Sequence, residues 1–196
     1  MHNLRKRTLK EKIEKGSIKS ERKEKQVGTN CEWFLVNFEK KWNRVRYFMK
    51  KTFLMWVKVE EAEKDYEILK TKFKNLIPNT VFIKTKYWEV FSFSEPVVID
   101  FDVLETKNKD FLILLLKNEN FWKKLLKQLK FFIRKFRELE AQWNILDLYW
   151  KENLVFTKSW KIKYIDNYEV FWKTKLVIEK SLIAIQYLEK IIKEFD

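Results

Sequence analysis

The spacing of apolar residues changes along the chain and divides it into a strand-rich first half and a helical second half. Between residues 31 and 59, three aromatic and β-branched runs (CEWFLVNF, RVRYFM and TFLMWVKV) alternate with charged residues and predict three strands, with a helix as the alternative for the middle run. Residues 60–73 predict an amphipathic helix, because their apolar positions recur at three- and four-residue intervals: Ala62, Tyr66, Leu69 and Phe73. Further strands are expected at residues 80–84 and 88–93.

The second half contains one more strand-like run, VVIDFDVLE at residues 97–105, and is otherwise mainly helical. A short apolar helix is expected at 109–116 and a long amphipathic helix at 120–139. A strand–loop–strand passage follows at 145–166, and a closing helix or helix pair at 170–195. The apolar face of the long helix consists of Trp122, Leu125, Leu126, Leu129, Phe132, Ile133 and Phe136.

This order predicts an α+β protein in which a small N-terminal mixed or antiparallel sheet with one helix packs on a reduced helical C-terminal lobe. We expect three parts. Residues 1–28 form a basic flexible tail, since the first 26 residues contain ten Lys or Arg against four Glu. Residues 29–104 form the strands and helix of the first lobe. Residues 105–196 form the second lobe, which includes a hairpin at 145–168.

The composition excludes several classes of protein and of functional site. Hydrophobic residues make up 46% of the chain, which excludes wholesale disorder. Cys31 is the only cysteine and His2 the only histidine, so an intrachain disulfide, a Cys/His zinc site and a His-dependent nucleophilic mechanism are excluded. The longest apolar run, at 111–116, is too short to span a bilayer, and we expect a soluble cytoplasmic protein. The net charge of +14 favours polyanionic partners.

The most informative passage is LDLYWKENLVFTKSWKIKYIDNYEV, at residues 146–170. It places Asp147, then Asn153 at the start of an apolar strand, and then Asp166 at the end of a second strand after a short hairpin. Aspartate and asparagine are also common turn residues between apolar strands, and turn formation alone is one explanation of the pattern.

The passage resembles the catalytic and metal-binding loops of protein-kinase-like proteins, in particular the small atypical bacterial kinase-like proteins of the PhoP regulatory network type. The resemblance covers roughly residues 50–170. It implies that Asp147 orients or deprotonates the acceptor hydroxyl, and that Asn153 and Asp166 hold Mg²⁺ through oxygen atoms. The implied cofactors are Mg²⁺ and ATP.

The resemblance extends to the first half of the chain. Lys58, at the end of the third strand run, stands where such proteins place the lysine that holds nucleotide phosphates. Glu67, in the predicted helix, is its candidate partner, and residues 97–105 resemble the strand that leads to the adenine-contacting hinge.

The sequence also departs from the kinase pattern. No glycine-rich loop precedes Lys58, the interval from Asp147 to Asn153 is one residue longer than usual, and Asn-Tyr follows Asp166. The missing glycines argue against a tight ATP cradle. Both an active phosphotransferase and an inactive, nucleotide-binding pseudokinase fit the sequence.

Two non-enzymatic functions are alternatives. Lysines interleaved with Trp and Phe could bind nucleic acid or another polyanion through a basic surface. Exposed aromatics on a shortened lobe could instead serve a dimer or a docked partner.

Overall fold

The computed structural model describes residues 10–11, 19–21, 27–28, 31–40, 43–52, 58–86, 90–118, 122–166, 171 and 174–195. Side chains are described at 10–11 and, within these ranges, from residue 58 onward. The chain divides into two compact units, one made of residues 1–67 and 78–96 and the other of residues 68–77 and 97–196.

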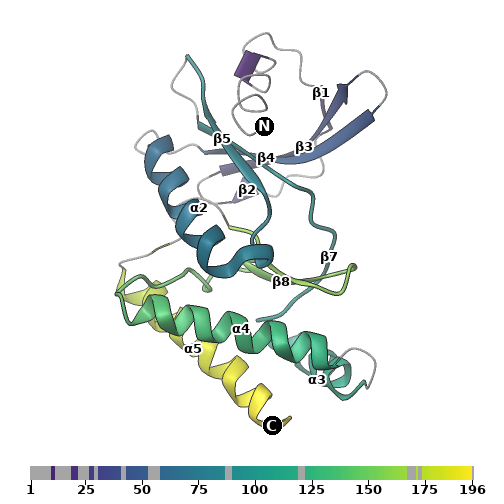
Figure 1. The fold of residues 1–196 in the computed structure, drawn as a ribbon, viewed down its shortest axis with the longest axis vertical. Coiled ribbons are helices and arrows are strands. Elements are labelled where there is room, and N and C mark those ends of the chain that lie inside the picture. Colours follow the sequence, from purple (N-terminus) through teal and green to yellow (C-terminus); the bar gives the residue numbers. More distant parts are fainter. Residues whose placement is uncertain are drawn as a thin grey trace. The chain divides into compact units, whose positions relative to one another are not determined.

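The first unit contains a six-stranded antiparallel sheet in the order β1-β3-β4-β6-β5, with β2 also paired to β3 (Figure 1). Its central hairpin pairs each residue of β3 with one of β4, from Cys31 opposite Thr52 to Lys40 opposite Asn43. The strand bounds are Lys19–Glu21 (β1), Val27–Gly28 (β2), Cys31–Lys40 (β3), Asn43–Thr52 (β4), Thr80–Lys84 (β5) and Val90–Ser94 (β6).

Helix α2, Val59–Phe73, lies between β4 and β5 in the sequence and confirms the predicted amphipathic helix. Glutamates in its first turn and lysines in its last turn suit the helix dipole. In the first unit the Tyr66 ring packs edge-on against Phe82, with 5.8 Å between ring centroids. The Tyr66 hydroxyl accepts a hydrogen bond from the Thr80 amide at 3.1 Å, which joins the helix to β5.

Two expectations for the first half need correction. Lys58 does not end a strand: its carbonyl accepts hydrogen bonds from the amides of Glu61 and Ala62, so it caps the start of α2. The predicted third strand otherwise falls mostly on residues 53–57, which lie outside the described residues. The expected flexible tail at 1–28 contains β1 and β2, because the long strand β3 offers its edge for pairing.

The second unit contains a three-stranded antiparallel sheet in the order β7-β8-β9. We expected residues 97–104 to belong with the first set of strands, but β7 pairs with β8 of the predicted hairpin instead. The bounds are Ile99–Asp102 (β7), Leu154–Thr157 (β8) and Ile162–Tyr164 (β9). Both hairpin strands therefore form where the sequence predicted them.

Three helices complete the second unit: Lys109–Lys117 (α3), Trp122–Glu140 (α4) and Lys175–Lys193 (α5). The short 3₁₀ helices η1, Lys74–Leu76, and η2, Thr106–Asn108, precede β5 and α3. Helices α4 and α5 pack against each other (Figure 1), and Arg137 of α4 donates two hydrogen bonds to the Glu189 carboxylate of α5, at 2.9 and 2.8 Å. These bonds raise the pKa of Arg137. No helix among the described residues is long and apolar enough to cross a membrane.

The core of the second unit is built largely from the apolar face predicted for α4. Phe132 and Phe136 are fully buried, and Phe132 stacks on Phe73, from the last turn of α2, with 5.2 Å between ring centroids. The fold is thus α+β with two small antiparallel sheets and four helices in the described part of the chain, as the sequence predicted at this coarse level.

We expect Phe132→Ala to lower the free energy of unfolding by about 3–5 kcal/mol, because it removes a fully buried ring from a packed core. Urea denaturation followed by circular dichroism measures the change. Lys127→Ala, on the exposed face of the same helix, is the control and should change stability by less than about 0.5 kcal/mol. Equal effects of the two substitutions would contradict this core.

Candidate metal and phosphate site

Hairpin β8–β9 brings two of the predicted site residues to the same end of a paired ladder. Leu154 is opposite Tyr164, and one step further out the Ile165 amide donates to the Asn153 carbonyl at 3.0 Å. Asn153 therefore lies opposite Ile165, and Asp166 follows directly. Residues paired in this way have Cα atoms about 4.5–5.5 Å apart, so Asp166 lies one residue beyond the partner of Asn153, although it comes thirteen positions later in the sequence.

Asp147 belongs to the same cluster. The side-chain amide of Asn153 donates to the Asp147 carbonyl at 3.0 Å, which closes the loop between the two residues. Asp147 is fully buried, and its Oδ1 accepts the Tyr149 amide at 2.9 Å. The adjoining Leu148 amide donates to the hydroxyl of Ser181, a buried residue of α5, at 2.9 Å. The loop is thus anchored to both the hairpin and the last helix.

Tyr164 is a buried tyrosine near the candidate site. Its ring is fully buried in β9, and its hydroxyl has no hydrogen-bond partner among the described residues. Burial raises the pKa of Tyr164 well above its usual value of 10, and the negative charges of Asp166 and Asp147 raise it further. Both carboxylates therefore disfavour the ionised form of the Tyr164 hydroxyl.

The donor set of this cluster fits a hard cation. Asn153 uses its amide nitrogen for the bond to Asp147, which directs its side-chain oxygen elsewhere, and Asp166 supplies a half-buried carboxylate. Oxygen ligands of this kind suit Mg²⁺, which keeps several waters and takes phosphate oxygens in place of a full protein cage. No group of three or more His, Cys, Asp or Glu side chains gathers among the described residues.

Lys58 and Glu67 belong to the first unit and are described there. The Lys58 ammonium group lies 3.3 Å from the Glu61 carboxylate, and both side chains are largely exposed. Glu67 is also exposed and stands two turns further along α2. In the described structure Lys58 therefore pairs with Glu61, and the assignment of Lys58 and Glu67 to a nucleotide stays a prediction.

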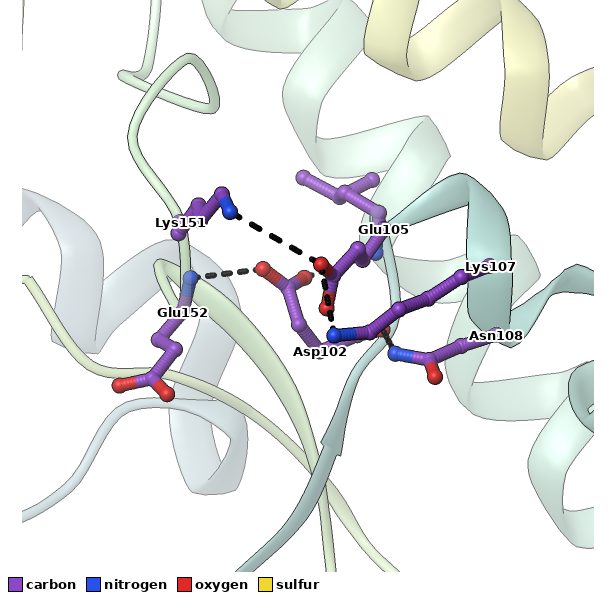
Figure 2. A network of polar contacts seen from close by, with 7 residues as sticks. Asp102, Glu105, Lys107, Asn108, Lys151 and Glu152 are labelled. Atoms are coloured by element: carbon purple, nitrogen blue, oxygen red, sulfur yellow. Dashed lines mark hydrogen bonds and ion pairs between the residues drawn. The ribbon is translucent and has the colours of Figure 1, made fainter.

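Sequence reasoning missed three residues that organise the loop: Tyr164, Ser181 and Asp102. Asp102 lies in β7 and accepts the Glu152 amide through Oδ2 at 2.7 Å (Figure 2). The signal for Asp102 and Ser181 was a polar residue within an apolar run, in VVIDFDVLE and in KSLIAI. No feature of the sequence marked Tyr164, because an aromatic residue is ordinary in a strand.

No protein-family model matches this chain, and no curated protein matches its sequence significantly. The kinase-like resemblance thus depends on the motif and on the order of the elements.

We expect Tyr164→Phe to flatten the loss of stability at alkaline pH. The pKa of Tyr164 is raised in the folded state, so above pH 10 the unfolded chain releases this proton while the folded chain keeps it, and stability falls as pH rises. Without the hydroxyl this contribution disappears. Urea unfolding at pH 9, 10 and 11 measures it, with Tyr149→Phe, at a partly exposed ring, as the control. Identical pH profiles for Tyr164→Phe and the unsubstituted protein would contradict the buried hydroxyl.

Proposed function

We propose that the second unit binds the phosphates of a magnesium nucleotide, as a kinase-like phosphotransferase or pseudokinase. The observation that carries the proposal is that Asn153, which is hydrogen-bonded to the Asp147 carbonyl, and Asp166 lie at the same end of hairpin β8–β9. Turn formation explains the bond from the Tyr149 amide to Asp147, but it does not require Asn153 and Asp166 to lie at the same end of the hairpin. The order of strands, helix, strands, helices and hairpin also supports it.

Each of the three residues has a distinct role in the proposed phosphate chemistry. Asn153 and Asp166 would hold Mg²⁺ through their side-chain oxygens, and the bound ion supplies charge neutralisation for phosphate oxygens. The hydrogen bond from Asn153 to the Asp147 carbonyl sets the distance between the metal ligands and the aspartate that would orient an acceptor hydroxyl.

The burial of Asp147 affects phosphate transfer more than nucleotide binding. Its side chain is fully buried, so an acceptor hydroxyl reaches the carboxylate only after a local opening of the loop. Of the two metal-binding candidates, Asn153 is also buried, with 8% of its surface exposed, whereas Asp166 is half-buried and does not share this restriction to the same degree. The geometry therefore supports nucleotide binding more strongly than turnover.

We expect saturating Mg-ATP to raise the thermal unfolding temperature of the protein, and Asp166→Asn to remove most of the rise. A ligand at a hundredfold excess over its Kd stabilises the native state by about 2.7 kcal/mol, which is a shift of roughly 5–10 °C for a chain of this size. Differential scanning fluorimetry with and without EDTA measures it.

Asp100→Asn is the matched control, since it makes the same chemical change at an exposed residue of β7. It should keep the full response to Mg-ATP. If the unsubstituted protein shows no magnesium-dependent shift at millimolar ATP, the proposed function is wrong.

A second function, binding of single-stranded nucleic acid, is favoured by the exposed face of α4. Exposed cationic side chains recur there at four-, three- and four-residue spacing, and the helix carries no carboxylate before Glu138. Two of them lie over aromatic rings, Lys123 over Trp122 and Arg134 over Phe131. A cationic row beside half-buried rings suits phosphates and stacked bases. The row consists of Lys123, Lys127, Lys130 and Arg134.

We expect replacement of both Lys123 and Lys127 by Gln to weaken binding of a fluorescent oligonucleotide. The slope of log K against log salt should fall by about 0.7 for each lysine that contacts a phosphate. Fluorescence anisotropy from low to moderate salt measures both quantities. Replacement of Lys190 and Lys193 by Gln, on exposed positions of α5, removes the same charge as a control. Equal losses for the two pairs would assign the effect to net charge and not to α4.

A further inference from the structure

Glu152 takes a backbone conformation that non-glycine residues seldom adopt. Its φ is 63°, in the left-handed region where a Cβ atom is crowded. It immediately precedes Asn153, and its own side chain is exposed. Because that side chain is not packed, contacts to the main chain must hold the residue in this conformation.

The contact that holds it comes from Asp102, fifty residues earlier in the chain. Oδ2 of Asp102 accepts the Glu152 amide at 2.7 Å (Figure 2), and the side chain is buried, with 7% of its surface exposed. A hydrogen bond from an amide to a buried carboxylate is charge-assisted and stronger than one to a neutral acceptor.

Asp102 is itself braced. Its Oδ1 accepts the Leu104 amide at 2.8 Å, and its carbonyl accepts the Asn108 side chain at 2.9 Å. The neighbouring Val103 amide donates to the Leu154 carbonyl at 2.9 Å, next to Asn153. The carboxylate therefore reaches Glu152 from a strand that is hydrogen-bonded to the strand on which Asn153 sits.

The nearby lysines do not explain the arrangement. Figure 2 shows Lys107 and Lys151 directed at Glu105, at 2.9 and 3.9 Å, and both lysine side chains are largely exposed. Exposed ion pairs of this kind contribute little. The Asp102 carboxylate accepts hydrogen bonds from two backbone amides, those of Leu104 and Glu152, so its geometry serves the main chain.

We propose that Asp102 is a positioning residue: it fixes the backbone of Glu152 in the left-handed conformation and so directs the Asn153 side chain toward Asp147 and the ligand. This inference rests on the proposed function, because the ligand is the magnesium nucleotide. Asp102 does not touch it. Asp102 acts on the orientation of the Asn153 side chain through the peptide unit that joins Glu152 to Asn153.

The test is the affinity for Mg-ATP of Asp102→Asn, measured by isothermal titration on protein shown by circular dichroism to be folded. Asparagine keeps the size of the side chain but presents an NH₂ group to one of the two amides that need an acceptor. We expect the Kd to rise roughly tenfold, the lower end of the effect of residues that orient metal ligands. Asp100→Asn is the control and should bind as the unsubstituted protein does.

A second substitution distinguishes positioning from a general loss of structure. Glycine adopts positive φ without a Cβ clash, so adding Glu152→Gly to Asp102→Asn should restore at least half of the lost affinity on a logarithmic scale. A purely structural role for Asp102 predicts no such rescue. Unchanged affinity of Asp102→Asn, or no rescue by Glu152→Gly, would overturn the proposal.

Amide hydrogen exchange separates this inference from the proposed function. If the unsubstituted protein does not bind Mg-ATP, the proposed function is wrong. The positioning role of Asp102 is then tested by the amide exchange rates of the loop alone. We expect the amides of residues 147–153 to exchange at least tenfold faster in Asp102→Asn than in Asp100→Asn. Equal exchange in the two variants would refute a positioning role whether or not a nucleotide binds.

Discussion

Strand β8 is the constraint on which the second unit depends. It pairs with β7 on one side and with β9 on the other, and all four of its residues are buried. The pairing with β9 fixes which residue stands opposite Asn153, and the pairing with β7 brings Asp102 within reach of Glu152. A slip of one residue in either ladder would turn every side chain of the shifted strand to the opposite face and would separate the polar groups. The candidate site is therefore a consequence of strand register more than of the loop sequence.

Local patterns predicted most of the elements, because the chain obeys the helix and strand periods closely. The stripe of α2 is buried at Ala62, Tyr66, Leu69 and Phe73, and the predicted face of α4 forms the core around Phe132. The pattern could not predict which distant segments pair with each other. The run containing β7 is equally compatible with either sheet, and only pairing over some fifty residues decides that it joins β8. Lys58 is a second example. Its place after an apolar run fits the end of a strand, but its carbonyl accepts the first hydrogen bonds of helix α2.

The candidate site was predicted in part for a related reason. Asp147, Asn153 and Asp166 stand in one passage, where spacing carries information, and the hairpin lies where the spacing predicted it. The residues that brace them, Asp102 and Ser181, lie 45 positions before and 34 positions after Asp147. Single polar residues in apolar runs are common, and nothing local shows which one will meet a backbone amide far away. The burial of Asp147 is likewise a tertiary property, and it bears most directly on the proposed phosphate transfer.

The hydrogen bond between the Leu148 amide and the Ser181 hydroxyl has a consequence for the order in which the protein takes shape. A ribosome makes the loop before it makes α5, so Leu148 leaves the exit tunnel without its acceptor. Elongation at roughly 5–20 residues per second delays the arrival of Ser181, 33 positions later, by a few seconds. During that interval the strands can pair, but the loop lacks one of its anchors. A nascent chain would thus acquire its sheet first and the final geometry of this loop afterwards, when the last described helix docks.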